Sequence, residues 1–388
     1  MLHSLAVKNY RSLKDLTLPL EQCNLVTGAN GSGKSNLYRG LRLLAETAMG
    51  TSTASIATEG GIESLLWAGP EAFSRKELAG DQRVQGKVKQ ESVNLRFGFA
   101  AEDFSYAIDY GLPKPVPGTM FGKDPCIKRE VIWHGPVWHP SRAMIERRGP
   151  VVRARDDNGK LQVIEQHMEP FDSMLFQVPD PVRAPEAFFL REAIRSWRFY
   201  DHFRSDQDAP ARQSNISTRT PVLSNDGHDL AAAWRTIVEV GDKEGLEAAV
   251  ADAFPGAHVD IVQKGGRFDL SFQQYGLLRP LSQSELSDGT LRYLLWIAAL
   301  LTPRPPALMV LNEPETSLHP ELLPALGRLM KKCAENTQLW VISHAPGLIE
   351  SLSENSNHIH LTKRLGETLI EGLDIFDFKT PAWKWPAR

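Results

Sequence analysis

A glycine-rich segment near the N-terminus has the residue types and the spacing of a phosphate-binding loop. The residues from Gly28 to Ser35 fit the pattern GxxxxGKS in full. In such a loop the glycines let successive backbone N–H groups surround a polyphosphate, the lysine reaches the β- and γ-phosphate oxygens, and the serine hydroxyl ligates Mg²⁺. Lys34 and Ser35 are the candidates for these two roles. The segment therefore predicts a site for a nucleotide polyphosphate and its magnesium ion.

The residues on either side of this loop predict the elements that hold it. Residues 24–27, with Leu25 and Val26 at their centre, are typical of a short buried strand, and Leu37, Leu41 and Leu44 follow the loop at roughly helical spacing. A strand that leads into the loop and a helix that begins in it are the context that this motif requires. A chance glycine-rich turn does not explain these flanks.

Two apolar runs in the C-terminal half also end in polar residues. Residues 308–311 are followed by Asn312 and Glu313, and residues 339–342 by Ser343 and His344. Buried parallel strands bring the residues at their carboxyl ends to one edge of a sheet. An acid at that edge can order a water for attack on a γ-phosphate, so Glu313 is the catalytic candidate. For His344, a structural role is the alternative to a role in the site.

A third segment has residues that could bind a second anion. Ser287 and Gly289 open an apolar helix that runs through residues 291–298. A serine hydroxyl, backbone N–H groups and the positive end of a helix dipole attract anions. A serine that only caps a surface helix explains the same residues equally well, and both interpretations stay open on these residues alone.

The order and spacing of these segments resemble those of the ABC-type ATPases, and in particular the SMC, RecF and OLD (overcoming lysogenization defect) group. The resemblance places the signature motif at residues 286–290, the Walker B end at Asn312 and Glu313, the D-loop at 317–320 and the switch histidine at His344. It also implies that Arg11, in an opening strand like that of the group, reaches back to the nucleotide. The expected catalytic residues are Glu313, His344 and Lys34, and the expected metal ligands are Ser35 and Asn312. The expected nucleotide-binding residues are Gly28, Ala29, Asn30, Gly31, Ser32, Gly33, Lys34, Ser35, Asn36, Arg11, Ser287 and Gly289.

Within this group the chain is most similar to stand-alone bacterial AAA-family ATPases. They share its NEPETSLHP and SDGT sequences and a terminal tail like residues 381–386. The resemblance covers about residues 1–70 and 185–388 and is loose between them. It implies hydrolysis of ATP with Mg²⁺, a homodimer that forms on ATP binding, and a role in DNA repair or anti-phage defence through a separately encoded effector. A larger assembly and binding of DNA are left open.

Two features depart from the pattern of the group. Asn312 stands where the wider superfamily has an aspartate, and an amide can hold a magnesium-bound water but lacks the negative charge. Slow hydrolysis or a tight Mg²⁺ dependence would follow. The Q-loop glutamine is also unassigned, because Gln82, Gln85 and Gln177 all lie in plausible connecting segments.

The predicted fold is an α/β P-loop NTPase, an ABC-type ATPase head. It has a parallel core sheet, an N-terminal antiparallel β portion, a β-rich insertion in place of a coiled coil, and a helical subdomain that bears the signature. The chain is predicted to divide into residues 1–75 with the phosphate loop, 76–184 as the insertion, 185–255 as the helical subdomain, and 256–388 with the signature, Walker B and the switch histidine.

Composition excludes several other classes of protein. The net charge is −3, so no overall basic excess marks a nucleic-acid coat or a polybasic membrane binder. The three cysteines, Cys23, Cys126 and Cys333, have neither a disulfide pattern nor zinc-ligand spacing. With no signal peptide and no membrane span in the sequence, the expected location is cytoplasmic and no membrane partner is expected.

Spacing argues against the alternative functions. An ATP-binding transporter subunit has its signature much closer to the phosphate loop than the 259 residues that separate Gly28 from Ser287 here. An OLD-type nuclease needs a further domain of about 100 residues, and 44 residues follow His344. Two basic clusters stay ambiguous. Either a DNA-binding surface or the packing of a helix explains residues 191–204, and either a solvated hairpin tip or a DNA groove explains residues 142–155.

Overall fold

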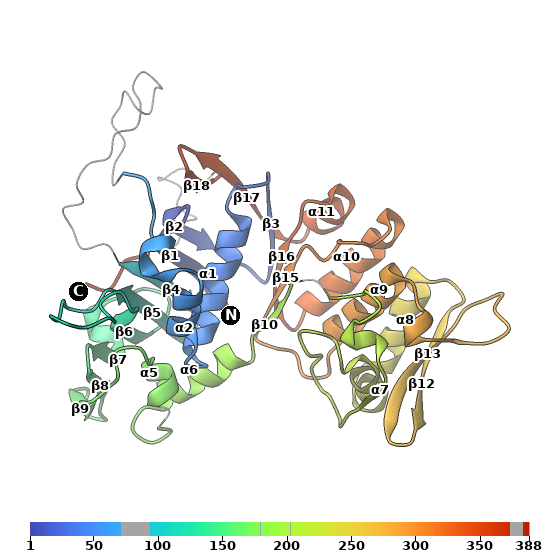
Figure 1. Cartoon of the computed structure of the whole chain (residues 1–388), viewed down its shortest axis with the longest axis horizontal. Helices are drawn as coiled ribbons and strands as arrows, with labels where there is room; N and C mark the ends of the chain where they lie inside the picture. The colour runs from blue at the N-terminus through green and yellow to red at the C-terminus, as the bar shows by residue number, and fades with distance from the viewer. Residues whose placement is uncertain (71–93, 179, 202, 373–382, 388) are drawn as a thin grey trace. The chain divides into compact units, whose positions relative to one another are not determined.

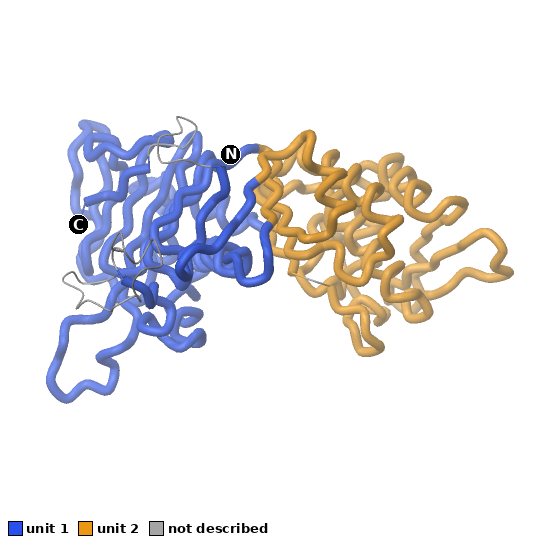
Figure 2. The backbone as a smooth tube through the Cα atoms, turned by 90° about the horizontal axis from the view of Figure 1, so that it is seen from above, with its two compact units in different colours: residues 1–21, 28–197, 359–388 blue, residues 22–27, 198–358 orange. Residues whose placement is uncertain are grey.

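Two units make up the chain. The computed structural model describes residues 1–70, 94–178, 180–201, 203–372 and 383–387. One unit consists of residues 1–21, 28–197 and 359–388, and the other of residues 22–27 and 198–358 (Figure 2). Each unit therefore combines segments that are far apart in the sequence.

An antiparallel sheet of eight strands forms the core of the first unit (Figure 1). Strands β7 and β8 alternate buried and exposed side chains, whereas β1 and β5 are buried along most of their length. The strands, in their order across the sheet, are β2 (Leu13–Pro19), β1 (Leu2–Tyr10), β4 (Leu95–Ala101), β5 (Phe104–Gly111), β6 (Cys126–His134), β7 (Ala143–Arg148), β8 (Val151–Arg155) and β9 (Leu161–Glu165). Strands β1 and β2 pair antiparallel, in agreement with the N-terminal antiparallel β portion expected from the sequence.

Helices and a second hairpin complete the first unit. Helix α1 packs on β1 and β4, where a Cβ on Gly40 would lie 3.3 Å from the Phe97 ring. The helices are α1 (Lys34–Thr47), α2 (Ser52–Thr58), α3 (Gly61–Leu65), α5 (Met174–Gln177) and α6 (Pro185–Arg195). The hairpin consists of β17 (Asn357–Arg364) and β18 (Glu367–Ile370) and lies within this unit from residue 359 onward.

The basic cluster of residues 142–155 is partly structural. Arg147 is fully buried, and its Nη1 lies 2.9 Å from Oε2 of Glu130, which is also fully buried. Tyr106 donates to the other oxygen of Glu130 at 2.7 Å, and the backbone N–H of Met174 donates to Oε2 at 2.9 Å. A buried charge needs such partners. The expectation of a wholly solvated hairpin is therefore wrong for Arg147, which the alternating pattern turns inward.

A parallel sheet forms the core of the second unit. Strand β10 pairs with β15, β15 with β16, and β16 with β3, all in parallel. Their bounds are β10 (Arg198–Tyr200), β15 (Leu308–Asn312), β16 (Gln338–Ile342) and β3 (Cys23–Gly28). A smaller antiparallel sheet contains β11 (Asn215–Ile216), β12 (His258–Lys264), β13 (Arg267–Gln273) and β14 (Leu281–Ser282). The runs at 308–311 and 339–342 are thus buried parallel strands, as predicted.

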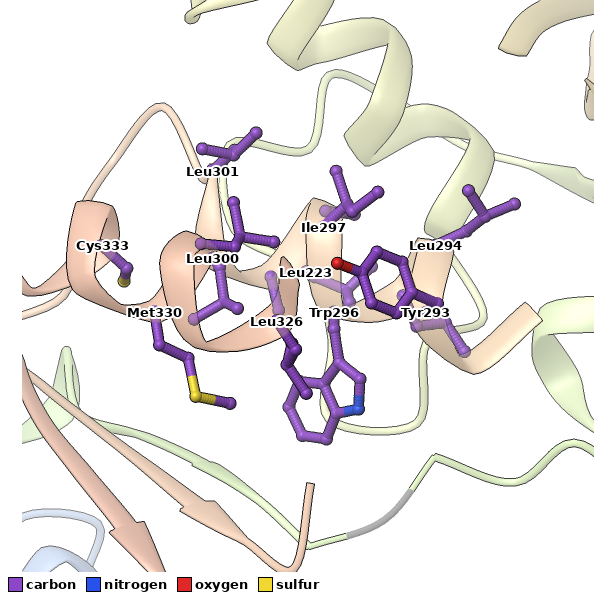
Figure 3. Close-up of a cluster of buried hydrophobic side chains, with 14 of the residues drawn as sticks. Leu223, Tyr293, Leu294, Trp296, Ile297, Leu300, Leu301, Leu326, Met330 and Cys333 are labelled. Carbon is purple, nitrogen blue, oxygen red and sulfur yellow. The ribbon is translucent and has the colours of Figure 1, made fainter. Parts of the chain in front are cut away.

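Five helices pack around these sheets. Figure 3 shows Trp296, Ile297 and Leu300 of α9 beside Leu326 and Met330 of α10. The helices are α7 (Leu230–Val240), α8 (Lys243–Ala253), α9 (Asp288–Leu300), α10 (Leu323–Ala334) and α11 (Pro346–Ser353). Nearly every residue of α9 from Leu291 onward is buried, which explains its continuous apolar sequence.

The segment between residues 185 and 253 is less helical than its sequence suggests. Helices α6, α7 and α8 form, but residues 198–200 are the strand β10. Asp229 occupies the cap position of α7, yet its carboxylate accepts from the backbone N–H of Ser224 at 3.0 Å and makes no cap bond. Trp197 and Phe203 are buried, so packing explains the aromatic part of the basic cluster at 191–204.

The structure addresses one further expectation. In the part of the chain that the structure describes, no helix has both the length and the apolar character needed to cross a membrane. The division into four segments remains a prediction about the organisation of the chain.

Candidate nucleotide-binding and hydrolysis site

The phosphate loop begins at the last residue of β3 and ends in the first turn of α1. Gly28, Gly31 and Gly33 all have positive φ, at 145°, 79° and 118°. A Cβ on Gly28 would lie 2.4 Å from the Leu361 carbonyl oxygen and 2.7 Å from the Ser32 hydroxyl, and one on Gly33 would lie 2.2 Å from the Thr368 hydroxyl. Both positions therefore need glycine for conformation and for space.

Lys34 bends back over this loop. It is the first residue of α1, and its Nζ donates to the carbonyl oxygens of Gly28 at 2.6 Å and Ala29 at 3.2 Å. Two carbonyl oxygens of the loop thus hold the Lys34 ammonium. A phosphate that replaces these two contacts can bind the ammonium and the backbone N–H groups at the start of α1. Ser35 is exposed in the same helical turn. The Ser32 hydroxyl is buried and has no hydrogen-bond partner among the described residues, as expected of a loop shaped for an added acceptor.

Residues of β18 and of the turn between β1 and β2 support the loop through hydrogen bonds. The Thr368 hydroxyl of β18 donates to the Ser32 carbonyl oxygen at 2.8 Å and lies 2.7 Å from the Ser12 hydroxyl. Asn36 donates to the same Ser12 hydroxyl at 2.8 Å. The structure thus places Asn36 in a network that supports the loop, while its predicted contact with nucleotide stays a prediction. The sequence analysis missed Thr368, because nothing local marks a residue 336 positions from its partner.

Arg11 forms an ion pair within the first unit. Its Nη2 lies 2.6 Å from Oε2 of Glu59, and its guanidinium lies 5.7 Å from the centre of the Tyr10 ring. Burial, with the charge of Glu59, raises the pKa of Tyr10 to about 12. Arg11 has a positive φ of 49°, and its N–H donates to the Leu65 carbonyl oxygen at 2.7 Å. Contact of Arg11 with nucleotide stays a prediction.

Glu313 and His344 lie together at the carboxyl edge of the parallel sheet. Asn312 of β15 is in register with Ile342 of β16, and the Glu313 N–H donates to the Ile342 carbonyl oxygen at 2.8 Å. Glu313 has a φ of 50°, a strained conformation for a non-glycine residue that is often found at functional sites. His344 Nδ1 lies 3.8 Å from Glu313 Oε1, and both side chains are about half exposed. An acid and an imidazole at this position can face a phosphate and an attacking water.

The same edge is continuous with the phosphate loop through the chain. Strand β16 lies between β15 and β3, and Ile342 is in register with Val26. The Ser343 N–H donates to the Val26 carbonyl oxygen at 3.1 Å. Since the loop starts at Gly28, the end of β3 leads directly into it. Ligands of open parallel sheets bind at this carboxyl edge.

A carboxylate that the sequence analysis missed lies beside Asn312. Asp201 follows β10, and Tyr200 is in register with Leu311 of β15. The Asn312 Nδ2 donates to Asp201 Oδ1 at 3.4 Å. The signal was present in the sequence, because residues 197–200 are a run with three aromatics that ends in Asp201, as the other two runs end in Glu313 and His344. Asn312 therefore has a negative charge next to it despite being an amide.

The glutamine that the resemblance calls for is not located. Gln82 and Gln85 lie outside the described residues. Gln177, at the end of α5, donates to Asp172 at 2.5 Å within the first unit. No glutamine is therefore assigned.

The predicted signature segment begins a capped helix, and an arginine side chain holds it in place. The Ser287 hydroxyl accepts from the Thr290 N–H at 3.2 Å, so the helix-cap interpretation is confirmed, and its binding role stays a prediction. Arg212, missed by the sequence analysis, donates to the Leu286 carbonyl oxygen at 2.7 Å and to the Asp288 carboxylate at 2.7 Å. These bonds hold the Leu286 backbone and the Asp288 side chain, on the two sides of Ser287. A Cβ on Gly289 would lie 3.2 Å from the Ser317 carbonyl oxygen, so Gly289 lies close to the predicted D-loop.

Comparisons with known proteins address the family. Residues 165–350 match a family model described as "AAA domain, putative AbiEii toxin, Type IV TA system", and residues 1–95 match one described as "AAA ATPase domain". No curated protein matches the chain.

Solved structures of SMC heads are similar in fold. A crystal structure of the SmcHead bound to the C-winged helix domain of ScpA covers 96% of this chain and 98% of its own, with a TM-score of 0.50 and 13% sequence identity. Parts of the chain thus match models of AAA-type ATPase domains, and its fold is similar to that of an SMC head. The predicted α/β P-loop ATPase fold is thereby confirmed.

Two further solved structures of SMC heads are similar to this chain, with TM-scores below 0.5. One is an Smc head with an extended coiled coil bound to the C-terminal domain of ScpA, derived from Pyrococcus furiosus, with 13% identity, a TM-score of 0.47 and 95% coverage of both chains. The other is the SMC head domain from Thermotoga maritima, with 14% identity and a TM-score of 0.43, covering 96% of this chain and 99% of its own.

Proposed function

We propose that this SMC-head ATPase binds ATP with Mg²⁺ and hydrolyses it to ADP and phosphate. The observation that carries the proposal is the meeting of Glu313 and His344 at the carboxyl edge of the parallel sheet, where the neighbouring strand β3 continues into a complete phosphate loop. The matches to AAA ATPase domains support nucleotide binding.

Each residue group has one task in this reaction. Residues 28–36 bind the phosphates through backbone N–H groups, with the Lys34 ammonium on the β- and γ-oxygens. Ser35 and Asn312 supply oxygen ligands of the kind that Mg²⁺ prefers, and the bound ion would neutralise charge on the phosphates. Glu313 orients the water and accepts its proton. His344 contacts the γ-phosphate and reports whether it is present.

Asn312 sets the expected rate of this reaction. The position lacks a carboxylate of its own, and the Asp201 carboxylate lies 3.4 Å from its amide nitrogen. We expect slow turnover with a strong dependence on Mg²⁺, because the metal is held by an amide with a neighbouring charge rather than by a direct carboxylate.

The proposal extends to pairs of the molecule. The Ser287 hydroxyl and the Gly289 N–H lie at the N-terminus of α9, a 13-residue helix whose dipole favours an anion. We propose that in an ATP-bound homodimer they meet the γ-phosphate held by the phosphate loop of the other copy. ATP binding then assembles the dimer, and hydrolysis releases it.

A partner protein is the expected recipient of this switch. The family description that matches residues 165–350 names a toxin of a toxin–antitoxin system, and one SMC-head relative is a complex with ScpA. We propose a cytoplasmic role in anti-phage defence or DNA repair with a separately encoded effector, as the sequence resemblance implies. DNA is a second ligand to test, and the charge of −3 requires any such surface to be local.

Lysine substitution tests the proposed activity. Lys34→Ala should abolish ATP binding in calorimetry and phosphate release with it, because it removes the cation nearest the loop carbonyl groups. Lys123→Ala is the matched control, since Lys123 is 79% exposed and belongs to the same unit. Equal ATP affinity of the Lys34→Ala and wild-type proteins would refute the nucleotide site.

A further inference from the structure

Glu315 has no role in the sequence analysis, yet one of its carboxylate oxygens accepts three hydrogen bonds at the edge of the parallel sheet. Its Oε1 accepts from the Ser343 hydroxyl at 2.8 Å, from the His344 N–H at 2.9 Å and from the Ala345 N–H at 3.2 Å. Its side chain is only 7% exposed. One oxygen of Glu315 thus holds three consecutive residues after β16.

The geometry around the imidazole connects Glu315 with Glu313. His344 Nδ1 lies 3.5 Å from Glu315 Oε1 and 3.8 Å from Glu313 Oε1. The same ring edge therefore faces both carboxylates, which leaves Nε2 on the opposite side of the ring. In histidines of this kind, the group near one nitrogen fixes the orientation in which the other is presented to a ligand.

The segment that contains Glu315 is itself held firmly. The Trp296 indole of α9 donates to the Pro314 carbonyl oxygen at 3.0 Å, and Arg292 donates to the Thr316 carbonyl oxygen at 2.9 Å. Both neighbours of Glu315 in the chain are therefore anchored to the signature helix. A carboxylate on so fixed a segment can impose a position on residues 343–345 rather than follow them.

The second carboxylate oxygen of Glu315 is shielded from solvent. Oε2 is buried and has no hydrogen-bond partner among the described residues. A buried oxygen without a hydrogen-bond partner lowers the stability of the fold. A carboxylate is therefore an unfavourable residue for holding this turn by structure alone. A role in function is the simplest reason to retain it.

We infer that Glu315 is a positioning residue for hydrolysis, which holds the backbone at Ser343, His344 and Ala345 so that the imidazole stays beside Glu313. This inference rests on the proposed ATPase function. Glu315 does not touch the reacting atoms, and it acts through the place of His344. The effect depends on the position of its acceptor oxygen, and the length of the side chain sets that position.

Two conservative variants separate the effect of side-chain length at Glu315 from the effect of its charge. Glu315→Gln keeps the length and one acceptor oxygen but removes the charge, whereas Glu315→Asp keeps the charge and withdraws the acceptor by one methylene. We expect Glu315→Gln to retain at least about a third of the wild-type kcat. We expect Glu315→Asp to lose about 10- to 100-fold in kcat, the scale of a misplaced catalytic group. ATP affinity, measured by calorimetry on the full chain, should stay within about threefold for both because neither touches the phosphate loop.

A double-mutant cycle with His344→Ala tests the route of the effect. If Glu315 acts through His344, then Glu315→Asp should cost less than about twofold in kcat when His344 is already alanine. A full 10-fold further loss in that background would overturn the inference, and so would wild-type kcat in Glu315→Asp or an equal loss in Glu315→Gln. Circular dichroism and thermal melts establish that each variant is folded.

The outcomes separate this inference from the proposed function. If the wild-type protein releases no phosphate from ATP, or if Lys34→Ala binds ATP normally, the ATPase proposal fails. If Lys34→Ala is inactive as expected but Glu315→Asp equals wild type, only the positioning role of Glu315 fails.

Discussion

The phosphate loop and the carboxyl edge of the parallel sheet are built in opposite ways. The loop takes its shape from contiguous residues, with positive φ at Gly28, Gly31 and Gly33. The sheet edge takes its residues from β10, β15 and β16, and its geometry depends on strand register. The conformation of the loop is thus set mainly by its own residues, with Thr368 as an outside support, whereas the assembled site depends on residues from separate segments such as Glu315 and Asp201. Substitutions in the loop should therefore weaken ATP binding, whereas substitutions at the sheet edge should change hydrolysis or its Mg²⁺ dependence.

The largest effect is expected within the loop. Gly33→Ala should weaken ATP binding at least tenfold, because its φ of 118° is unfavourable for alanine and the new methyl would lie 2.2 Å from the Thr368 hydroxyl. Gly31→Ala is the matched control, since Gly31 also has positive φ but a Cβ there meets nothing within 4 Å. Calorimetry with ATP measures both. Equal affinities for the two variants would mean that space behind the loop does not shape the site.

The next effect concerns the signature as part of an assembled site. Ser287→Arg should abolish ATP-driven pairing and lower hydrolysis at least tenfold, because it places bulk and charge where the phosphate of the other copy must dock. Light scattering with ATP measures the pairing. Mixing Ser287→Arg with Lys34→Ala should restore some activity, since one site of each mixed dimer has an intact loop facing an intact signature. Activity no higher than that of either variant alone would rule out a site made by two chains.

A moderate effect is expected where the loop depends on a distant strand. Thr368→Val should weaken ATP binding by about 3- to 10-fold, because it removes the hydrogen bonds to Ser32 and Ser12, each worth about 1 kcal/mol. Thr362→Val on β17 is the control, because it makes the same chemical change in the same hairpin. If Thr368→Val binds ATP as the wild type does, the loop holds its shape without β18.

The smallest effect is expected at Asn312, a predicted metal ligand. Asn312→Asp should lower the Mg²⁺ concentration for half-maximal hydrolysis by about 2- to 5-fold, because it adds a carboxylate near the ion. Asp201→Asn should raise that concentration, because it removes the charge 3.4 Å from the Asn312 amide. Magnesium titrations of phosphate release measure both shifts. Identical titrations for all three proteins would remove Asn312 and Asp201 from the neighbourhood of the metal.

The same contrast explains what could be predicted from the sequence. The strand, loop and helix around Lys34 were predictable because their signals are local, and so were the apolar runs that end at Glu313 and His344. Strand β10 was missed because it has three residues and adjoins helix α6, so periodicity does not distinguish it. Arg147, Arg212 and Thr368 were missed because their roles come from partners that are close only after folding. Spacing cannot reveal such partners.

The central claim is that Glu313 promotes hydrolysis of the ATP that this chain binds, and a single-turnover experiment on Glu313→Gln tests it most directly. Enzyme in excess over ATP is mixed with Mg²⁺, and bound ATP and released phosphate are followed together, with Glu321→Gln as a control at an 88% exposed side chain. The account predicts that Glu313→Gln binds ATP as tightly as wild type but releases phosphate at least about 100-fold more slowly, the scale of a lost general base. Phosphate release at the wild-type rate, or loss of ATP binding in Glu313→Gln, would contradict it.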